Sequence, residues 1–343
     1  MIQLQQKPGR TTIIDGKEYL FFSGYSYLGL GCHEKFLHLI KQGIDEYGVV
    51  YPSSRISNTP LQVYTAFENK LAALTHTEAA VVFSSGFLSA RTAVEIIAEE
   101  MNVYCMAPAH PASSHHHQAK LITTDWNTFL DERVKANELK FALAIDSINP
   151  TPGRITDFNF LKEVPSSFHI ILIVDDSHGI GWMGANGEGI ISKLNLPSTI
   201  ELLLNFSLSK AYHLNAGAVC GSEKWVEKAK QHINFTTSTP PMPALAHAFL
   251  HAGEIFEQQR NLLHQNIQYL QNLTSTFTFA ANEGTPVFVV NKQSVAPYLL
   301  QNNVIISSFG YPRPENSPVN RVVVNALHLK SDLEKLAQLM EQF

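Results

Sequence analysis

The chain has 343 residues, of which 45% are hydrophobic and 16% are charged, with a formal net charge of −5 and a pI of about 6.3. This composition predicts a large globular domain with a smaller second one, and it argues against binding to nucleic acid or membrane, because no basic patch and no apolar run of membrane-spanning length is present. The three cysteines, Cys32, Cys105 and Cys220, are widely spaced, which predicts reduced thiols and a cytoplasmic location.

The N-terminal part of the chain predicts a hairpin followed by helices. Apolar residues on both sides of Asp15-Gly16 indicate a β-hairpin over residues 11–22. Helical periodicity follows over 33–47 and again over 63–74, where Pro60 gives a good helix start.

A possible anion site follows the next buried strand, residues 79–83. Ser85, Gly86 and Phe87 come directly after this strand and before a helical segment. A strand, a Ser-Gly turn and a helix in this order direct free backbone N–H groups and the positive end of the helix toward an anion. The same sequence also occurs in ordinary strand–helix turns, so the pattern alone leaves both interpretations open.

Two later strands end in residues that suit one cofactor. The branched run 170–174 predicts a strand buried on both faces, and it ends in Asp175. Another buried run, 201–206, is followed by Ser207 and Lys210. Ligands bind at the carboxyl edge of such sheets. A lysine to form a Schiff base, a carboxylate for the pyridine nitrogen and a serine for the phosphate suit pyridoxal phosphate.

These strand ends also match a known pattern. The matching residues are Val174-Asp175-Asp176-Ser177-His178-Gly179-Ile180-Gly181, Gly184, Gly187-Glu188-Gly189 and Ser207-Leu208-Ser209-Lys210-Ala211. They resemble the cofactor-binding segments of the α-oxoamine synthases, fold-type-I pyridoxal-phosphate enzymes that include 8-amino-7-oxononanoate synthase and 2-amino-3-ketobutyrate CoA ligase. The resemblance implies that Lys210 carries the cofactor, Asp175 holds its ring nitrogen and His178 bonds its phenolic oxygen.

Weaker matches extend the resemblance from about Glu18 to the C-terminus. In the family, amides like those of Ser85–Phe87 hold the cofactor phosphate, a histidine like His110 stacks on the ring, and a pair like Thr236-Thr237 reaches the partner subunit's phosphate. Arg321 matches the arginine that binds the amino-acid carboxylate as a bidentate fork. Tyr25 stands where the family has an asparagine near that carboxylate, so we also expect Tyr25 at the substrate.

Two segments, 51–58 and 146–153, depart from the family pattern. Within the second, Asn149-Pro150-Thr151 resembles the Asn-Pro-Thr-Gly motif of related aminotransferases, whose asparagine bonds the phenolic oxygen of the cofactor. We therefore add Asn149 to the candidate cofactor-binding residues. An aminotransferase, or another carbanion enzyme on the same fold, remains an alternative, and a non-catalytic relative is a third possibility because the segment before the hairpin is short.

The C-terminal part predicts strands at 216–221, 286–290 and 303–307, and a long helix from Pro240 to about Leu273. We expect an α/β fold of fold type I with a mainly parallel, seven-stranded-type sheet. The parts are an N-terminal hairpin and arm (1–50), a large cofactor-binding domain (51–240), and a linking helix with a small α+β C-terminal domain (241–343).

The reaction implied by the resemblance is the condensation of an amino acid with an acyl-CoA, with loss of carbon dioxide, in a homodimer with active sites at the interface. Lys210, His110, Asp175 and His178 are the expected catalytic residues. L-alanine with pimeloyl-CoA, a step of biotin biosynthesis, is the preferred substrate pair because the chain is compact. No metal is expected, since adjacent histidines such as 115–117 point in different directions and indicate a solvated run.

Overall fold

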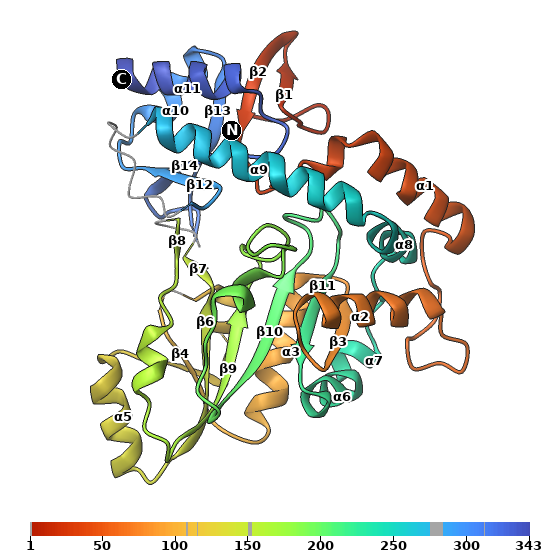
Figure 1. Cartoon of the computed structure of the whole chain (residues 1–343), viewed down its shortest axis with the longest axis vertical. Helices are drawn as coiled ribbons and strands as arrows, with labels where there is room; N and C mark the ends of the chain where they lie inside the picture. The colour runs from red at the N-terminus through yellow and green to blue at the C-terminus, as the bar shows by residue number, and fades with distance from the viewer. Residues whose placement is uncertain (1, 108, 115, 150–152, 275–283, 312) are drawn as a thin grey trace.

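A seven-stranded sheet forms the centre of the larger part of the molecule in this computed structural model, which describes residues 2–107, 109–114, 116–149, 153–274, 284–311 and 313–343 (Figure 1). The strands, in spatial order, are β3 (Ala79–Phe83), β11 (Gly217–Gly221), β10 (Ile200–Ser207), β9 (His169–Asp175), β6 (Lys140–Asp146), β4 (Val103–Cys105) and β5 (Ala119–Leu121). Only β11 runs antiparallel to its neighbours. The mainly parallel sheet expected from the apolar runs is confirmed.

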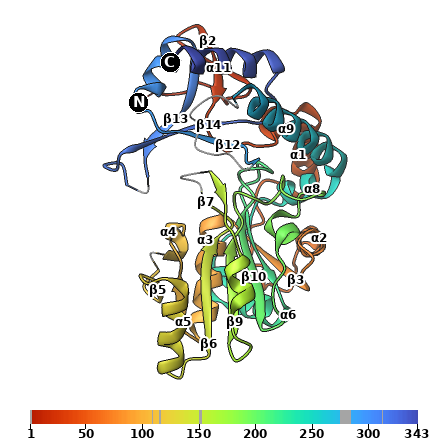
Figure 2. The same ribbon diagram turned by 60° about the vertical axis from the view of Figure 1, so that its left-hand side comes forward.

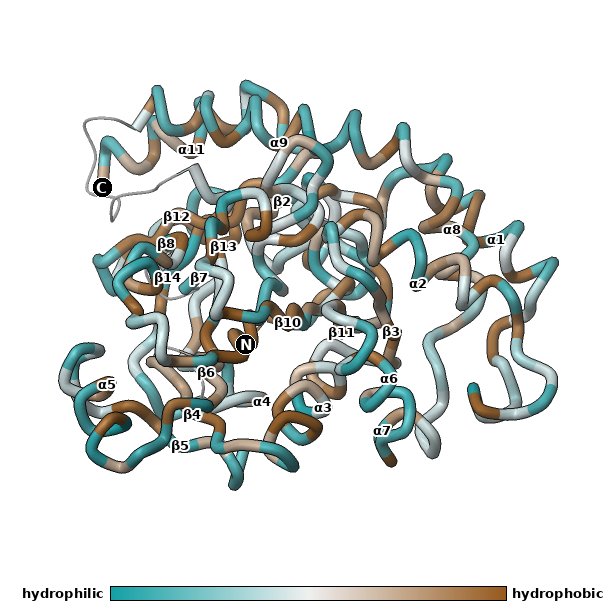
Figure 3. Tube along the Cα trace, turned by 60° about the horizontal axis from the view of Figure 1, so that its bottom comes forward, coloured by the Kyte–Doolittle hydropathy of each residue, from teal (hydrophilic) through white to brown (hydrophobic). Residues whose placement is uncertain are grey.

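The sheet is covered on both faces, because side chains along each strand alternate between two cores. Along β9, Ile170, Leu172 and Val174 enter one core, while Ile171 and Ile173 enter the other. Figure 2 shows helices on both sides of this sheet. Figure 3 shows the strands as mostly hydrophobic and the outer helices as alternating between hydrophobic and hydrophilic residues.

A second, five-stranded sheet combines the two ends of the chain. Its strands, in spatial order, are β1 (Thr11–Ile14), β2 (Lys17–Phe22), β13 (Val304–Gly310), β14 (Pro318–Val323) and β12 (Val287–Val290). The hairpin turn falls where it was expected, with positive φ angles at Asp15 and Gly16. Strand β2 pairs in parallel with β13, so the hairpin belongs to the sheet of the C-terminal strands. The division into three domains remains a prediction.

The helices connect and cover the two sheets. They are α1 (Glu34–Tyr47), α2 (Gln62–Leu74), α3 (Gly86–Ala98), α4 (Pro111–Ser114), α5 (Trp126–Lys135), α6 (Glu223–Gln231), α7 (Ile233–Thr236), α8 (Pro243–His251), α9 (Gly253–Leu273), α10 (Val295–Gln301) and α11 (Lys330–Gln342). Short 3-10 helices occupy η1 (Leu30–Cys32), η2 (Asn159–Glu163) and η3 (Gly189–Lys193), and a small ribbon pairs β7 (Ile148–Asn149) with β8 (Arg154–Ile155). No helix among the described residues is long and apolar enough to span a membrane.

The long helix expected from Pro240 to Leu273 is wrong in one respect: it is two helices that change direction at the buried Ala252. Helix α8 is seen end-on in Figure 1, whereas α9 crosses the view toward the five-stranded sheet. The two helices pack against different elements: α8 lies so close to α1 that a Cβ on Gly43 would come within 2.8 Å of the Ala244 Cα, whereas α9 packs against α11. Gly253, a poor helix former, begins the second helix directly after the break.

Candidate active site

A cavity of about 290 Å³ lies between the carboxyl edge of the seven-stranded sheet and the five-stranded sheet. Its volume is at the lower end of the range for small-molecule sites. Asp146, Asp175, Ser207 and Lys210 line it from the larger sheet, and Tyr25, Phe309, Tyr311 and Arg321 line it from the smaller one. The two sheets therefore enclose one site.

Lys210 and Asp175 meet in this cavity, as the sequence predicted. Asp175 ends β9, and Lys210 follows the end of β10. These two strands pair in parallel, from Ile200 with Ile170 to Asn205 with Asp175, and this pairing brings their carboxyl ends together at the cavity. Burial lowers the pKa of Lys210, and the carboxylates of Asp175 and Asp146 oppose this shift. The amine is thereby held closer to its neutral, nucleophilic form than a surface lysine is.

An anion cradle lies where α3 begins. Ser85 caps the helix by accepting a hydrogen bond from the Leu88 N–H at 3.2 Å, and the Gly86 backbone approaches β10 so closely that a Cβ there would lie 2.4 Å from the Ser207 Cβ. Gly86 and Phe87 both line the cavity. The first N–H groups of a helix lack intrahelical partners, so they and the Ser207 hydroxyl can receive a phosphate.

His110 also lines the cavity, and a residue that sequence reasoning missed holds it there. The His110 N–H donates to Asp146 Oδ1 at 3.0 Å, and Asp146 ends β6 directly beside Asp175 on β9. Burial, and then the charge of Asp175, raise the pKa of Asp146 well above the usual carboxyl range, while burial lowers that of His110. The available signal was that Asp146, like Asp175, ends a buried strand.

His178 is held by a second missed residue, Tyr27. The His178 Nδ1 and the Tyr27 hydroxyl lie 2.8 Å apart, and the Trp182 indole N–H donates to the His178 carbonyl. Burial lowers the pKa of His178 well below its ordinary value and raises that of Tyr27. Both groups are therefore neutral at physiological pH, and Nδ1 faces the tyrosine.

Arg321 is fully enclosed, with 2% of its surface exposed, yet its guanidinium is only partly satisfied. Nη1 donates to the Tyr25 hydroxyl at 2.5 Å, and the guanidinium lies over the Phe309 ring at 5.3 Å. Within the part of the chain that the structure describes, Nε and Nη2 have no hydrogen-bond partner. Buried donors of this kind require an acceptor, and a carboxylate ligand would supply one.

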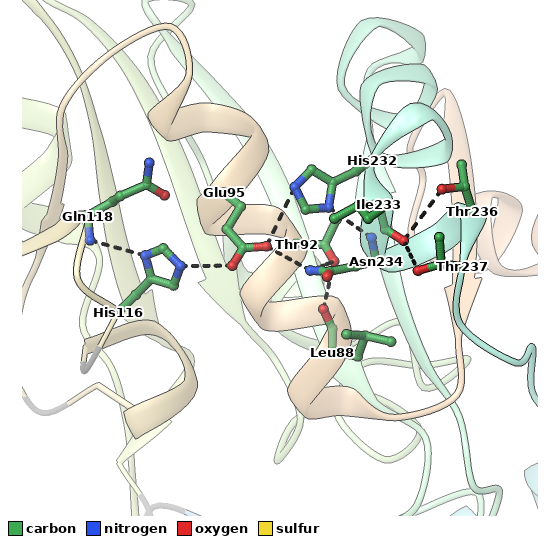
Figure 4. Close-up of polar contacts among 10 residues, drawn as sticks. All are labelled: Leu88, Thr92, Glu95, His116, Gln118, His232, Ile233, Asn234, Thr236 and Thr237. Atoms are coloured by element: carbon green, nitrogen blue, oxygen red, sulfur yellow. Dashed lines mark hydrogen bonds and ion pairs between the residues drawn. The ribbon is translucent and has the colours of Figure 1, made fainter.

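Four sequence-predicted residues do not line the cavity: Ser85, which caps the start of α3 beside it, and Asn149, Thr236 and Thr237. Thr236 and Thr237 lie at the end of α7, where both hydroxyls donate to the Ile233 carbonyl (Figure 4). Asn149 lies in β7, next to the cavity-lining Ile148. Pro150 and Thr151 of the same motif lie outside the described residues. The roles given to these residues remain predictions.

The histidine run at 115–117 was expected to be solvated, which is wrong for His116. Its side chain is buried, and its Nε2 lies 2.9 Å from Glu95 Oε1. The local pattern did not reveal this because Glu95 lies 21 residues earlier in the sequence, on α3. His115 lies outside the described residues, and among those described no group of three or more His, Cys, Asp or Glu side chains could hold a metal.

Comparison with known proteins identifies relatives over nearly the whole chain. It is 25% identical to the 8-amino-7-oxononanoate synthase of Thermosipho melanesiensis, over 96% of this chain and 90% of that protein. It is 27% identical to the enzyme of the same name from Coprothermobacter proteolyticus, over 95% of this chain and 88% of that protein. The resemblance to the α-oxoamine synthases is thereby confirmed.

Solved structures share the fold. Serine palmitoyltransferase from S. paucimobilis superposes with a TM-score of 0.84 at 17% identity, covering 100% of this chain and 92% of that one. The 8-amino-7-oxononanoate synthase of Francisella tularensis gives 0.75 at 22% identity, covering 94% and 97%. The fold-type-I architecture is confirmed. The model of the family "aminotransferase class I and II" matches residues 18–339, and the chain belongs to that family.

Proposed function

We propose that the chain is a pyridoxal-phosphate-dependent acyltransferase that condenses an amino acid with an acyl-CoA, with L-alanine and pimeloyl-CoA as its substrates. The observation that carries this proposal is the meeting of Lys210 and Asp175 in a buried cavity whose opposite wall presents the unsatisfied Arg321. The nearly full-length relatives named 8-amino-7-oxononanoate synthase support the choice of reaction within the family.

The residues of the cavity fit pyridoxal phosphate. The S. paucimobilis enzyme of the same fold was solved with this cofactor bound. In the present chain, the start of α3 and Ser207 would hold the phosphate, Asp175 would accept the ring N–H, and Lys210 would bond the aldehyde carbon. When bound, the cofactor supplies a protonated ring that withdraws electrons from the substrate's α-carbon.

Side chains of the cavity would bind the substrate and transfer its α-proton. Arg321 would bind the amino-acid carboxylate with Nε and Nη2, which no described residue engages, and Tyr25 would fix the orientation of the guanidinium. Lys210, whose pKa burial lowers, is the base that would take the α-proton. Because Tyr27 occupies Nδ1 of the neutral His178, the imidazole can direct Nε2–H at an oxygen acceptor in the cavity.

A homodimer is part of the proposal. Thr237 does not line the cavity of its own chain, and exposed apolar side chains lie in the segments around it: Val49, Val50, Ile56, Phe87 and Ile233. A partner chain would cover these side chains and receive Thr237 at its own cofactor phosphate. The three cysteines are free, which supports the reducing, cytoplasmic location expected from the sequence.

The experiment that tests the reaction separates acyl transfer from transamination, the alternative raised by Asn149 and by the breadth of the family. Alanine with pimeloyl-CoA should release CoA thiol and carbon dioxide in equal amounts. Alanine with a 2-oxo acid should give little pyruvate under the same conditions. Steady pyruvate formation without thiol release, across acyl-CoAs of several lengths, would assign the chain to the aminotransferases instead.

A further inference from the structure

Glu95 joins three side chains from two separate segments, away from the cavity (Figure 4). It lies on α3, the helix whose start forms the anion cradle. Its Oε1 accepts a hydrogen bond from His116 Nε2 at 2.9 Å, and its Oε2 accepts one from Asn234 Nδ2 at 2.7 Å. His232 Nε2 lies 3.6 Å from the same Oε2.

The two imidazoles are oriented for this carboxylate. Nδ1 of His116 accepts from the Gln118 N–H at 3.2 Å, and Nδ1 of His232 accepts from the Asn234 N–H at 3.3 Å. A neutral ring whose Nδ1 is an acceptor carries its proton on Nε2, and both Nε2 atoms face Glu95. Both carboxylate oxygens of Glu95 therefore face hydrogen-bond donors. The four side chains form a hydrogen-bond network rather than an isolated ion pair on the surface.

The network holds α7, which is too short to be stable by itself because a single turn does not repay the cost of nucleating a helix. Asn234 is its anchor, since Nδ2 also donates to Thr92 Oγ1 at 3.2 Å. From the other side, the Ser54 hydroxyl donates to the Thr236 carbonyl at 2.7 Å. The direction in which Thr237 points thus depends on contacts made one turn earlier, at Asn234.

We propose that Glu95 is a positioning residue that acts in trans: by fixing α7 on its own subunit, it sets cofactor affinity in the partner's active site. This inference rests on the proposed role of Thr237 toward the partner's phosphate. Glu95 does not line the cavity. It is connected to Thr237 through Asn234 and the turn of α7 that follows.

The first experiment measures pyridoxal phosphate binding to homodimers as the cofactor concentration that gives half-maximal borohydride labelling of Lys210. Glu95→Ala and Asn234→Ala should each raise this midpoint about tenfold, the effect expected for one charge-assisted hydrogen bond. Glu99→Ala is the matched control: Glu99 ends the same helix and pairs with Lys228 on the surface. It should leave the midpoint unchanged, and thermal unfolding should show all three variants folded.

The second experiment uses mixed dimers in which one subunit carries Glu95→Ala and the other Lys210→Ala. Only the first subunit can then be labelled, and its phosphate meets the intact Thr237 of the second. The midpoint should return to the wild-type value. If the mixed dimer has the same raised midpoint as the Glu95→Ala homodimer, Glu95 acts on the phosphate site of its own subunit, and the proposal is overturned. A wild-type midpoint in both the Glu95→Ala and the Asn234→Ala homodimers would also overturn it.

A Thr237→Ala homodimer separates failure of this inference from failure of the proposed function. It should weaken cofactor binding by a similar factor, and it should recover in the same mixed-dimer arrangement. Normal binding in Thr237→Ala would show that Thr237 does not serve the phosphate, which removes the basis of the proposed dimer site. Weak binding in Thr237→Ala with normal binding in Glu95→Ala would overturn only the role of Glu95.

Discussion

Arg321 has a buried, planar guanidinium whose Nε and Nη2 have no hydrogen-bond partner among the described residues, so its geometry should matter more than its charge. Arg321→Lys keeps the charge but loses the fork that can grip both oxygens of a carboxylate. We expect the KM for the amino acid to rise by about tenfold or more, with a smaller change in kcat, because the lost interaction binds the ground state and the transition state equally. Steady-state kinetics would measure this, with the exposed Arg154→Lys as the control.

A different result for Arg321→Lys would contradict the assignment of Arg321 to the amino-acid carboxylate. If Arg321→Lys lowers kcat and leaves the KM for the amino acid unchanged, the guanidinium does not bind the substrate carboxylate. An unchanged KM for the amino acid together with a raised KM for the acyl-CoA would assign Arg321 to the second substrate.

Asp176 should make the stability of the protein depend on pH. It is fully buried, its Oδ2 accepts a hydrogen bond from the Ile190 N–H at 2.9 Å, and burial raises its pKa from the ordinary carboxyl range to about 7. The folded protein therefore holds this proton up to a higher pH than the unfolded chain does. The contribution of Asp176 to the free energy of unfolding falls as pH rises from about 4 to 7, and it is constant above that.

Asp176→Asn has no proton to lose, so its stability relative to the wild type should improve as pH rises through this window. Urea unfolding at a series of pH values would measure the difference. The exposed Asp131→Asn is the control for the loss of one carboxylate elsewhere on the protein. A difference for Asp176→Asn that does not change with pH would show that Asp176 is already ionised in the folded state.

At the scale of elements, the start of α3 packs closely against the end of β10. Gly86→Ala would put a Cβ at 2.4 Å from the Ser207 Cβ, so the helix start must move and the cradle must open. We expect weaker pyridoxal phosphate binding, by about tenfold or more, and a loss of roughly 1–3 kcal/mol in stability from overpacking. Titration with the cofactor and urea unfolding would measure the two effects.

Gly253→Ala is the matched control, because Gly253 begins α9 with no atom within 4 Å of the position of a new Cβ. It should be neutral or slightly stabilising, since alanine favours a helix more than glycine does. Equal cofactor affinity in Gly86→Ala and Gly253→Ala would mean that the start of α3 does not hold the phosphate.

The elements predictable from the sequence were those with strong local patterns. The run over 170–174 forms β9, as expected, because a strand buried on both faces requires consecutive apolar residues. Asp15-Gly16 forms the hairpin turn because positive φ angles favour these residue types, so each element leaves a recognisable pattern in the local sequence. The break at Ala252 left only a weak pattern, Gly253, because α8 and α9 pack against different elements that only the fold brings to them. Tyr27 and Asp146 were missed for a similar reason: their partners, His178 and His110, are brought to them only by the fold.

At the scale of the whole molecule, the loop before α2 presents the apolar Val49, Val50 and Ile56 to solvent, and Ser54 joins this loop to α7. Val50→Asp should weaken the proposed dimer by about a hundredfold, because the partner chain would bury an unpaired carboxylate, which costs several kcal/mol. Cofactor binding should weaken with it as the dimer is diluted. Sedimentation equilibrium with and without pyridoxal phosphate would measure both effects.

Val134→Asp is the control for this prediction, because Val134 is equally exposed, at 54% against 55% for Val50, but lies on α5 at the opposite end of the sheet (Figure 1). It should change neither assembly nor binding. A monomeric Val50→Asp protein that binds the cofactor as tightly as the wild type would contradict a shared active site.

The parallel pairing of β2 with β13 has a consequence for folding during synthesis on the ribosome. During synthesis, all seven strands of the larger sheet are available once Gly221 has left the ribosome, whereas Leu20 must wait for Val304. The hairpin therefore keeps an unpaired edge until β13 has been made, and the smaller sheet, with its wall of the cavity, forms only after Arg321 on β14 has followed. On the proposed assignments, the residues for the cofactor phosphate are in place before the arginine for the substrate carboxylate.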